Sequence, residues 1–255
     1  IGVPVVLAEL SVGRRTEKNA VGAFKVLFPN AKWHWLGGLG VITGFGILAF
    51  YSVVAGWTLW YLWAAIKGGF SGPITADGSA EIFGTMVADP VVVIALTGVF
   101  MVMTVLVVRR GVSEGIERTT KILMPLLFLI LLVLAFRSVT LPGGMEGLVY
   151  LFKPDFSKIS LAVVMSALGQ ALFSLSLGMG AMITYGSYFP KDENLPQAGA
   201  AVALFDTAIA LLAGVIIFPA LFSAGGEPDA GPGLVFVVLP TIFGSLPAGN
   251  LFAIA

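Results

Sequence analysis

The length of the uncharged stretches is the strongest constraint on how this chain folds. Residues 33–66 contain no Asp, Glu, Lys or Arg over 34 positions, and residues 90–108 contain none over 19. A helix of about 20 apolar residues crosses the hydrocarbon core of a bilayer. The chain is 58% hydrophobic and 11% charged, whereas soluble domains carry about 25% charged residues. We therefore predict an all-α integral membrane protein and exclude a water-soluble globule.

Further apolar runs divide the chain into six predicted membrane helices. Residues 1–11 form half a span, so we expect the chain to begin inside a helix and to end inside another. Residues 18–28 are predicted to form an amphipathic helix on the membrane surface, and residues 234–243 a re-entrant or surface helix. The other predicted spans comprise residues 33–66, 90–108, 122–136, 159–190 and 194–226.

Charged and metal-binding residue types exclude several functions. The 14 Lys and Arg residues balance the 14 Asp and Glu residues, so no basic surface indicates nucleic-acid binding. The chain has no cysteine, which excludes disulfides, thiolate catalysis and cysteine-based metal sites. Its single histidine, His34, excludes a multi-histidine metal site.

The distribution of Lys and Arg orients the predicted bundle. Ten of the 14 fall in alternate loops, within residues 14–32 and 109–121 and at Lys191, and four fall in the opposite loops. Cytoplasmic loops are enriched in Lys and Arg, so we expect the first set of loops to be cytoplasmic. The expected location is the inner (plasma) membrane of a prokaryote, with several passes.

The most informative motif is FSLSLGMG, residues 173–180, in the middle of an uncharged run. Free backbone groups at mid-bilayer depth cost several kcal/mol unless protein or a water-lined cavity satisfies them. A broken helix offers amides to a carboxylate and carbonyls to a dehydrated Na⁺, so a break here indicates a binding site. Close helix packing by small residues is the alternative interpretation.

Three polar side chains inside predicted spans are candidate functional residues. Burying Glu9 or Asp206 in ionised form costs about 2.5–3.5 kcal/mol on insertion scales, so each should face the bundle interior and have a partner. Asp206 is interpreted as a Na⁺ ligand, a proton carrier or a structural hydrogen-bond acceptor. Glu9 is interpreted first as an acceptor for amides that the broken helix frees. Tyr51 is a candidate to bind a ligand carboxylate, with simple packing as the alternative.

At these residues the sequence resembles the neurotransmitter:sodium symporter family, specifically its bacterial amino-acid branch, over essentially the whole chain. GVPVVLAELSVGRR (residues 2–15) resembles the family's second helix, AFYSVVAGWTL (49–59) its third, and FSLSLGMGAMITYGSY (173–188) its unwound sixth. The run from Gly115 to Pro125 matches its pattern of glycine, nine residues and proline. The resemblance thus covers helices two to seven and the start of the eighth.

This resemblance implies both a fold and a function. The implied fold is part of a five-plus-five inverted-repeat bundle in a single transporter domain, with residues 1–137 forming helices two to five of the first repeat and residues 159–255 starting the second. The implied function is symport of Na⁺ and an amino acid by alternating access. Because the family's first and eighth helices supply other sodium ligands, we expect these 255 residues to hold only part of the ion sites.

The same resemblance assigns roles to individual residues. Ser174 and Asp206 would ligate sodium, and the charge of Asp206 could replace that of chloride, so chloride dependence stays open. Tyr51 would bind the substrate carboxylate, with Phe173 as a lid. The substrate pocket would be lined by Ile47, Tyr51, Phe173, Ser174, Ser176 and Met179. Gating or structural roles would fall on Glu9, Gln170, Ser187, Tyr188, Gly115 and Pro125.

The expected substrate is a hydrophobic or aromatic amino acid, because the flexible thioether of Met179 can repack around large ligands. The expected partners are that amino acid and the lipid bilayer, with no nucleic acid, and the oligomeric state is open. One alternative is a proton-coupled transporter with Asp206 as the proton carrier. Another is an intramembrane enzyme that uses Ser174 or Ser176, for which the sequence places no base nearby. A non-transporting scaffold would not explain the mid-bilayer break.

Overall fold

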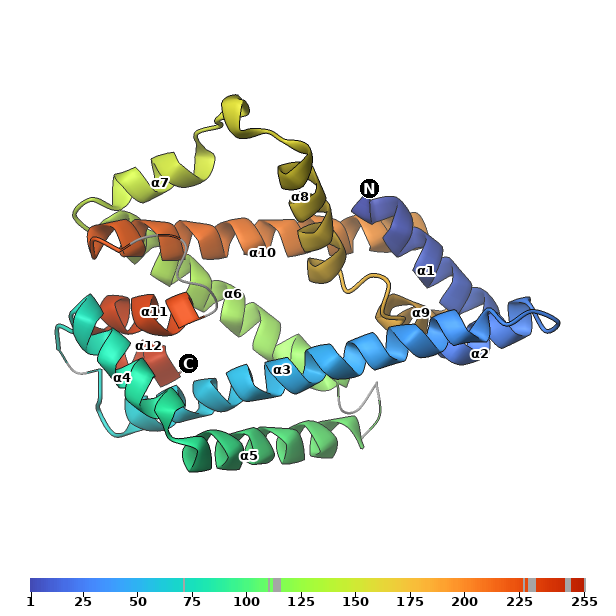
Figure 1. Ribbon diagram of the computed structural model, residues 1–255, viewed down its shortest axis with the longest axis horizontal. Coiled ribbons are helices and arrows are strands. Elements are labelled where there is room, and N and C mark those ends of the chain that lie inside the picture. Colours follow the sequence, from blue (N-terminus) through green and yellow to red (C-terminus); the bar gives the residue numbers. More distant parts are fainter. Residues whose placement is uncertain are drawn as a thin grey trace. The chain divides into compact units, whose positions relative to one another are not determined.

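The computed structural model describes residues 1–70, 72–109, 111, 116–226, 228, 233–245 and 249–254, and the side chains of all of these except residues 251 and 252. All regular structure in this part of the chain is helical (Figure 1), which confirms the predicted all-α fold class. The elements are α1 (Gly2–Thr16), α2 (Ala20–Leu27), α3 (His34–Ile66), α4 (Ala76–Ala88), α5 (Pro90–Val108), α6 (Arg118–Val139), α7 (Gly144–Phe152), the 3₁₀ turn η2 (Phe156–Lys158), α8 (Leu161–Ser174), α9 (Ala181–Gly186), α10 (Leu195–Ser223), α11 (Leu234–Gly244) and α12 (Gly249–Ile254).

Among the described residues, four helices are long and apolar enough to cross a membrane: α3, α5, α6 and α10. They coincide with four of the predicted spans, and α6 reaches its length by starting at Arg118, upstream of the predicted run. α5 has no buried residue, and its Val91 and Ile94 are 74% and 71% exposed. Apolar surface on this scale needs lipid or further membrane helices to cover it.

The ends of several helices follow from local sequence. Asn19 caps α2 by accepting a hydrogen bond from the amide of Gly22 at 2.8 Å, and so begins a helix within the predicted amphipathic segment. Asp89 caps α5 with Pro90 in the first turn, where a missing N–H has no cost. Pro125 lies inside α6, a position that membrane helices tolerate.

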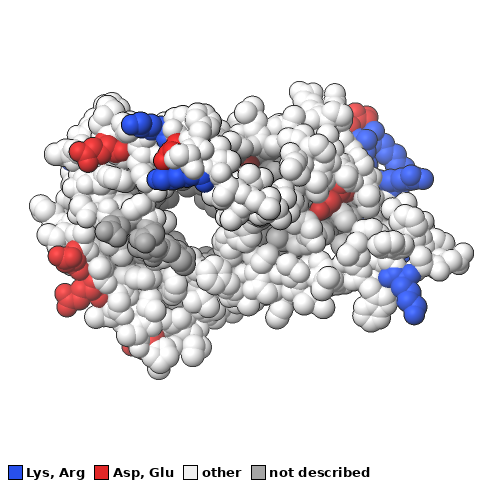
Figure 2. All heavy atoms as spheres, turned by 45° about the horizontal axis from the view of Figure 1, so that its top comes forward, with Lys and Arg blue, Asp and Glu red and all other residues white. Residues whose placement is uncertain are grey.

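The chain forms two compact units, which are described separately. The first comprises Ile1–Ala49 and Pro154–Ala208, and the second comprises Phe50–Lys153 and Ile209–Ala255. On the face that Figure 2 shows, Lys, Arg, Asp and Glu side chains form small separate groups between broad areas of uncharged atoms.

In the first unit, α1 and α2 both pack against α9. Leucine and valine side chains from α1, from the segment after α8 and from the start of α10 form its larger core. This core consists of Val6, Leu10, Leu175, Leu177 and Leu195. A smaller cluster joins Ala20 and Ala23 of α2 to Ile183 of α9.

In the second unit, α11 packs against α4, α6 and α12. Two side chains from membrane helices hold the backbone of this region. The Tyr61 hydroxyl donates to the carbonyl of Phe236 at 2.9 Å, and the Arg137 guanidinium donates to the carbonyl of Ser245 at 3.2 Å. The segment predicted as a re-entrant or surface helix is therefore an 11-residue helix fixed to α3 and α6.

Candidate functional site

A break between α8 and α9 lies at the position that the FSLSLGMG motif predicts. α8 ends at Ser174 and α9 begins at Ala181, and Figure 1 shows the non-helical connection between them. Ser176, Gly178 and Gly180 have left-handed backbone conformations, with φ of 55°, 81° and 78°. Glycine adopts such a conformation without strain, whereas a residue with a side chain pays about 1–2 kcal/mol. The discontinuous helix in the predicted fold class is confirmed.

The break frees backbone groups, and one of them is bound by a carboxylate from another helix. The amide of Gly178 donates to Oε1 of Glu9 on α1, at 2.7 Å. Within the break, the amides of Ser176 and Leu177 instead reach carbonyls of α8, at 3.0 and 2.8 Å. Oε2 of Glu9 is buried and has no hydrogen-bond partner among the described residues. Glu9 thus joins α1 to the broken segment through a charge-assisted hydrogen bond.

A second carboxylate meets the end of α8. The hydroxyl of Ser174 lies 2.8 Å from Oδ1 and 2.7 Å from Oδ2 of Asp206, which is on α10. No Lys or Arg forms an ion pair with Asp206 in the part of the chain that the structure describes. Hydroxyl and carboxylate oxygens are ligands that hard cations prefer, so this pair of side chains fits the chemistry of a sodium ligand set.

Glycines allow α9 to approach α1 closely and so fix the segment that follows the break. A Cβ at Gly13 would lie 2.9 Å from the carbonyl carbon of Ile183 and from the amide of Ser187, and a Cβ at Gly186 would lie 2.8 Å from Cα of Leu10. No side chain fits at such distances from backbone atoms. These reciprocal contacts were not predicted, because glycine spacing within one helix does not identify the partner helix.

The beginning of α3 also approaches the break. A Cβ at Gly40 would lie 3.0 Å from the carbonyl carbon of Met179, whereas Gly38 and Gly44 have no atom near enough to meet a Cβ. Gly40 therefore lets α3 pack against the backbone of the broken segment. Ile47 lies on the same helix, half-buried and within the first unit.

The remaining predicted site residues have varied surroundings. Phe173 lies near the end of α8 and its side chain is 44% exposed. Gln170, one turn earlier on the same helix, is also exposed. Ser187, after α9, donates to the carbonyl of Thr184 at 2.7 Å, and Tyr188 is exposed.

Tyr51 is on α3, one turn after Ile47, and belongs to the second unit. Pro125 also belongs to that unit, inside α6. Gly115 lies outside the described residues.

Two polar contacts near the ends of α1 and α9 were not singled out from sequence. The Arg14 guanidinium donates to the carbonyl of Glu193 at 2.6 Å, and Lys191 and Glu17 form an ion pair at 3.2 Å. The only signal for them was the gathering of charges in these two loops.

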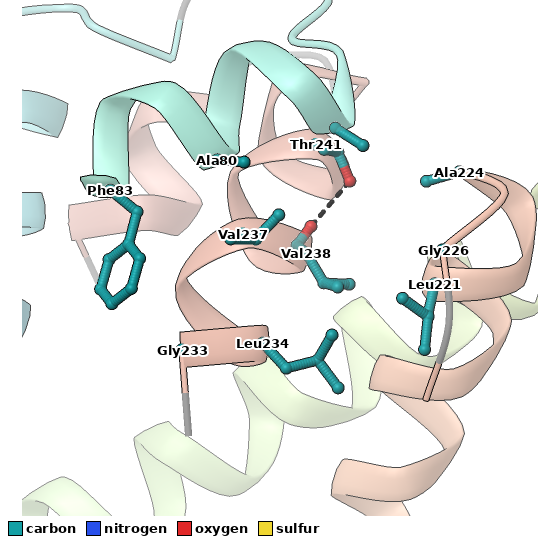
Figure 3. A pocket seen from close by; sticks show the side chains of 11 residues that line it. Ala80, Phe83, Leu221, Ala224, Gly226, Gly233, Leu234, Val237, Val238 and Thr241 are labelled. Carbon is teal, nitrogen blue, oxygen red and sulfur yellow. Dashed lines mark hydrogen bonds between the residues drawn. The ribbon is translucent and has the colours of Figure 1, made fainter. Parts of the chain in front are cut away.

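A separate cavity of about 290 Å³ lies in the second unit, between α4, the end of α10 and α11. Figure 3 shows Ala80 and Ala224 pointing into it from opposite sides, with Val237, Val238 and Leu221 around it. Among the described residues that line it, one has a hydroxyl side chain: Thr241, which donates to the carbonyl of Val238 at 2.7 Å. None of the predicted site residues that the structure describes lines this cavity.

Comparisons with known proteins relate the chain to sodium-dependent transporters. It is 44% identical to the uncharacterized sodium-dependent transporter YhdH of Bacillus subtilis, in an alignment that covers 100% of this chain and 56% of YhdH. It is 43% identical to an uncharacterized sodium-dependent transporter of Haemophilus influenzae, in an alignment that covers 100% of this chain and 58% of that protein. The mouse sodium-dependent neutral amino acid transporter B(0)AT3 is 28% identical over 89% of this chain and 41% of its own length. The chain therefore spans little more than half the length of its bacterial relatives.

A solved structure and a family profile extend this result. The crystal structure of MhsT in complex with L-phenylalanine matches 100% of this chain and 58% of the MhsT chain, with a TM-score of 0.94 and 50% identity. The profile of the sodium:neurotransmitter symporter family matches residues 85–255. The relatives named above are transporters and not enzymes, which removes the intramembrane serine enzyme. With two thirds of its length under this profile and its helices superposable on those of MhsT, the chain belongs to the sodium:neurotransmitter symporter family.

Proposed function

We propose that the protein carrying this chain is a sodium-coupled symporter of hydrophobic or aromatic amino acids. The observation that carries the proposal is the contact of Ser174 with Asp206 at the end of the broken helix, at 2.7–2.8 Å. This contact brings a hydroxyl and a carboxylate together at the residue where the regular helix α8 ends. Such half-helix ends are where membrane transporters bind ions and anionic substrate groups.

Sodium is the ion that we assign to Ser174 and Asp206, as a transported substrate. Bound Na⁺ would take oxygen ligands from both side chains, and the negative charge of Asp206 offsets the positive charge of the ion in a medium of low dielectric constant. Because Asp206 supplies this charge, we propose that transport does not require chloride. Family membership and the sodium-dependent relatives support sodium as the coupling ion.

The substrate assignment rests on the resemblance of these residues to the motifs of the family. We propose that Tyr51 binds the substrate carboxylate and that Ile47, Phe173, Ser174, Ser176 and Met179 line the pocket for its side chain. The presence of L-phenylalanine in the MhsT complex, which shares 50% identity, supports an amino acid with an apolar side chain.

The remaining assignments concern organisation and gating. We propose a single transporter domain in which residues 1–137 belong to the first repeat and residues 159–255 to the second. Glu9 fixes the broken segment. Gating or structural roles are proposed for Gln170, Ser187, Tyr188, Gly115 and Pro125. The proposed location is the inner (plasma) membrane.

Uptake into proteoliposomes tests the proposal. The full-length protein should accumulate radiolabelled L-phenylalanine under an inward Na⁺ gradient, with a protonophore present and with gluconate in place of chloride. Asp206→Ala should abolish this uptake while the protein remains folded in the membrane. Preference for glycine or a biogenic amine in competition assays would contradict the substrate class, and normal Na⁺ dependence of Asp206→Ala would contradict the ligand assignment.

Proton coupling is the second candidate, because Asp206 is a carboxylate inside a candidate membrane helix and such groups form proton relays. In that case an inward proton gradient without Na⁺ should drive uptake, and the protonophore should abolish it. The same proteoliposomes distinguish the two mechanisms.

A further inference from the structure

The segment between α1 and α3, residues 17–33, carries lysines and exposed apolar side chains together. Lys18, Lys25 and Lys32 are all exposed. From residue 18 to residue 35 there is no Asp or Glu. Apolar side chains of the same stretch are also exposed: Val26 by 56%, Phe28 by 47%, Trp33 by 55% and Trp35 by 71%. Water alone is a poor environment for this set of aromatic and aliphatic groups.

Packing within the first unit fixes which face of α2 is exposed. Ala20 and Ala23 are buried against Ile183 of α9. A Cβ at Gly37 would lie 2.8 Å from the carbonyl carbon of Ala20, so the start of α3 also holds this face. Since α2 is held on its alanine face, Lys25 and Val26 remain on its free side. The exposed face is therefore a property of the fold and not of a loose loop.

The depth of this segment in the bilayer follows from α3. That helix is a candidate membrane span and begins at His34, directly after Lys32 and Trp33. Residues 17–33 therefore lie at a membrane surface, where tryptophan is enriched and where lysines meet lipid headgroups. Phe28 and Trp33 form an aromatic pair there, with ring centroids 6.4 Å apart.

Few acidic groups lie close to this surface, and one of them already forms an ion pair. Glu17 forms an ion pair with Lys191, at 3.2 Å, and Arg14 binds the carbonyl of Glu193. Asp192 and the carboxylate of Glu193 lie in the connection between α9 and α10. With Arg15 added, the positive charges of residues 14–32 outnumber these acids.

We propose that the exposed face of residues 18–35 binds the headgroups of anionic phospholipids. The lysine ammonium groups bind the phosphates, and Val26, Phe28, Trp33 and Trp35 enter the boundary between headgroups and acyl chains. This combination of basic and apolar groups is how interfacial helices bind anionic membranes. The binding does not depend on the transport function proposed above.

Native mass spectrometry of the full-length, delipidated protein tests the proposal, with phosphatidylglycerol or phosphatidylcholine added in steps. The protein should bind phosphatidylglycerol preferentially. Each lysine near an anionic surface strengthens binding roughly fivefold, so replacing Lys18, Lys25 and Lys32 by Gln should weaken phosphatidylglycerol binding roughly 100-fold. Replacing the same three by Arg should retain it, which separates loss of charge from loss of structure.

The matched control replaces three other lysines, Lys67, Lys153 and Lys158, by Gln. This variant loses the same charge from other loops and should bind phosphatidylglycerol within about twofold of the parent. Equal loss in the control would show a general effect of charge and overturn the proposal. Retained affinity in the Lys18/Lys25/Lys32 variant, or no preference for phosphatidylglycerol in the parent protein, would overturn it as well.

Discussion

The hydroxyl of Ser174 lies within 2.8 Å of both carboxylate oxygens of Asp206. The two residues are 32 positions apart, one at the last residue of α8 and the other within α10. The contact brings a polar pair to the point where the helix stops. A carboxylate inside a membrane segment requires such a partner, and the same two oxygen-bearing groups suit a bound sodium ion.

Ser174→Ala should lower the apparent affinity for sodium. The substitution removes one oxygen ligand and leaves Asp206 without the hydrogen bond that orients it. A hydrogen bond to a charged group contributes about 1.5–3 kcal/mol, so the half-saturating Na⁺ concentration for uptake should rise roughly 10- to 100-fold. Ser174→Thr, which keeps the hydroxyl, should behave much more like the parent.

Ser166→Ala is the matched control for this prediction. Ser166 is on the same helix, two turns earlier, and is exposed. Its replacement should leave the sodium dependence of uptake unchanged. An unchanged sodium response in Ser174→Ala would remove Ser174 from the ion site.

Glu9→Ala should destabilise the broken segment. The amide of Gly178, which donates to Glu9 at 2.7 Å, would lose its acceptor. A hydrogen bond to a charged group contributes about 1.5–3 kcal/mol, and Glu9→Gln should cost less than Glu9→Ala because its amide oxygen can still accept the hydrogen bond. Thermal unfolding in nanodiscs measures the difference. Glu146→Ala, an exposed residue on α7, should show no such loss; equal melting temperatures of Glu9→Ala and the parent would contradict the role of Glu9.

The sequence predicted the position of the break but not all of its contacts. Ser176, Gly178 and Gly180 interrupt an apolar run. The break in the helix can be predicted there because its cause, a cluster of serine and glycine residues, is local in the sequence. The need of Glu9 and Asp206 for partners was also predictable, because an intramembrane charge cannot remain alone. The pairing of Ser174 with Asp206 was implied by the family resemblance, since no local pattern relates residues 32 positions apart.

The packing of α1 on α9 could not be predicted from the sequence. Gly13 is close to other small residues, and many helix surfaces carry such residues without a partner. Gly38 and Gly44 are examples, because neither has an atom near enough to meet a Cβ. Whether a glycine makes a close contact depends on where a second helix runs. The pattern of residues within one helix carries no information about the position of another helix.

Gly13→Ala should therefore destabilise the first unit, although alanine favours helices. Its Cβ would lie 2.9 Å from two backbone atoms of the segment 183–187, and overpacking of this kind costs about 1–3 kcal/mol. Gly169→Ala is the control, because it is also in a helix and has nothing near the added Cβ. That variant should be neutral or more stable by up to about 1 kcal/mol. The melting temperature of Gly13→Ala should therefore be lower than that of the parent, and the melting temperature of Gly169→Ala should be equal or higher. A Gly13→Ala variant as stable as the parent would contradict the close packing.

Tyr51→Phe tests the proposed contact with the substrate carboxylate. Loss of one charge-assisted hydrogen bond, about 1.5–3 kcal/mol, should weaken binding of L-phenylalanine roughly 10- to 100-fold. Binding of phenethylamine, which has the same ring and amine but no carboxylate, should be unaffected. Tyr61→Phe is the control on the same helix: its hydroxyl holds the carbonyl of Phe236, so its loss should lower thermal stability and leave substrate affinity unchanged. If Tyr51→Phe binds L-phenylalanine as the parent does, or weakens both ligands equally, the hydroxyl does not bind the carboxylate and Tyr51 serves packing alone.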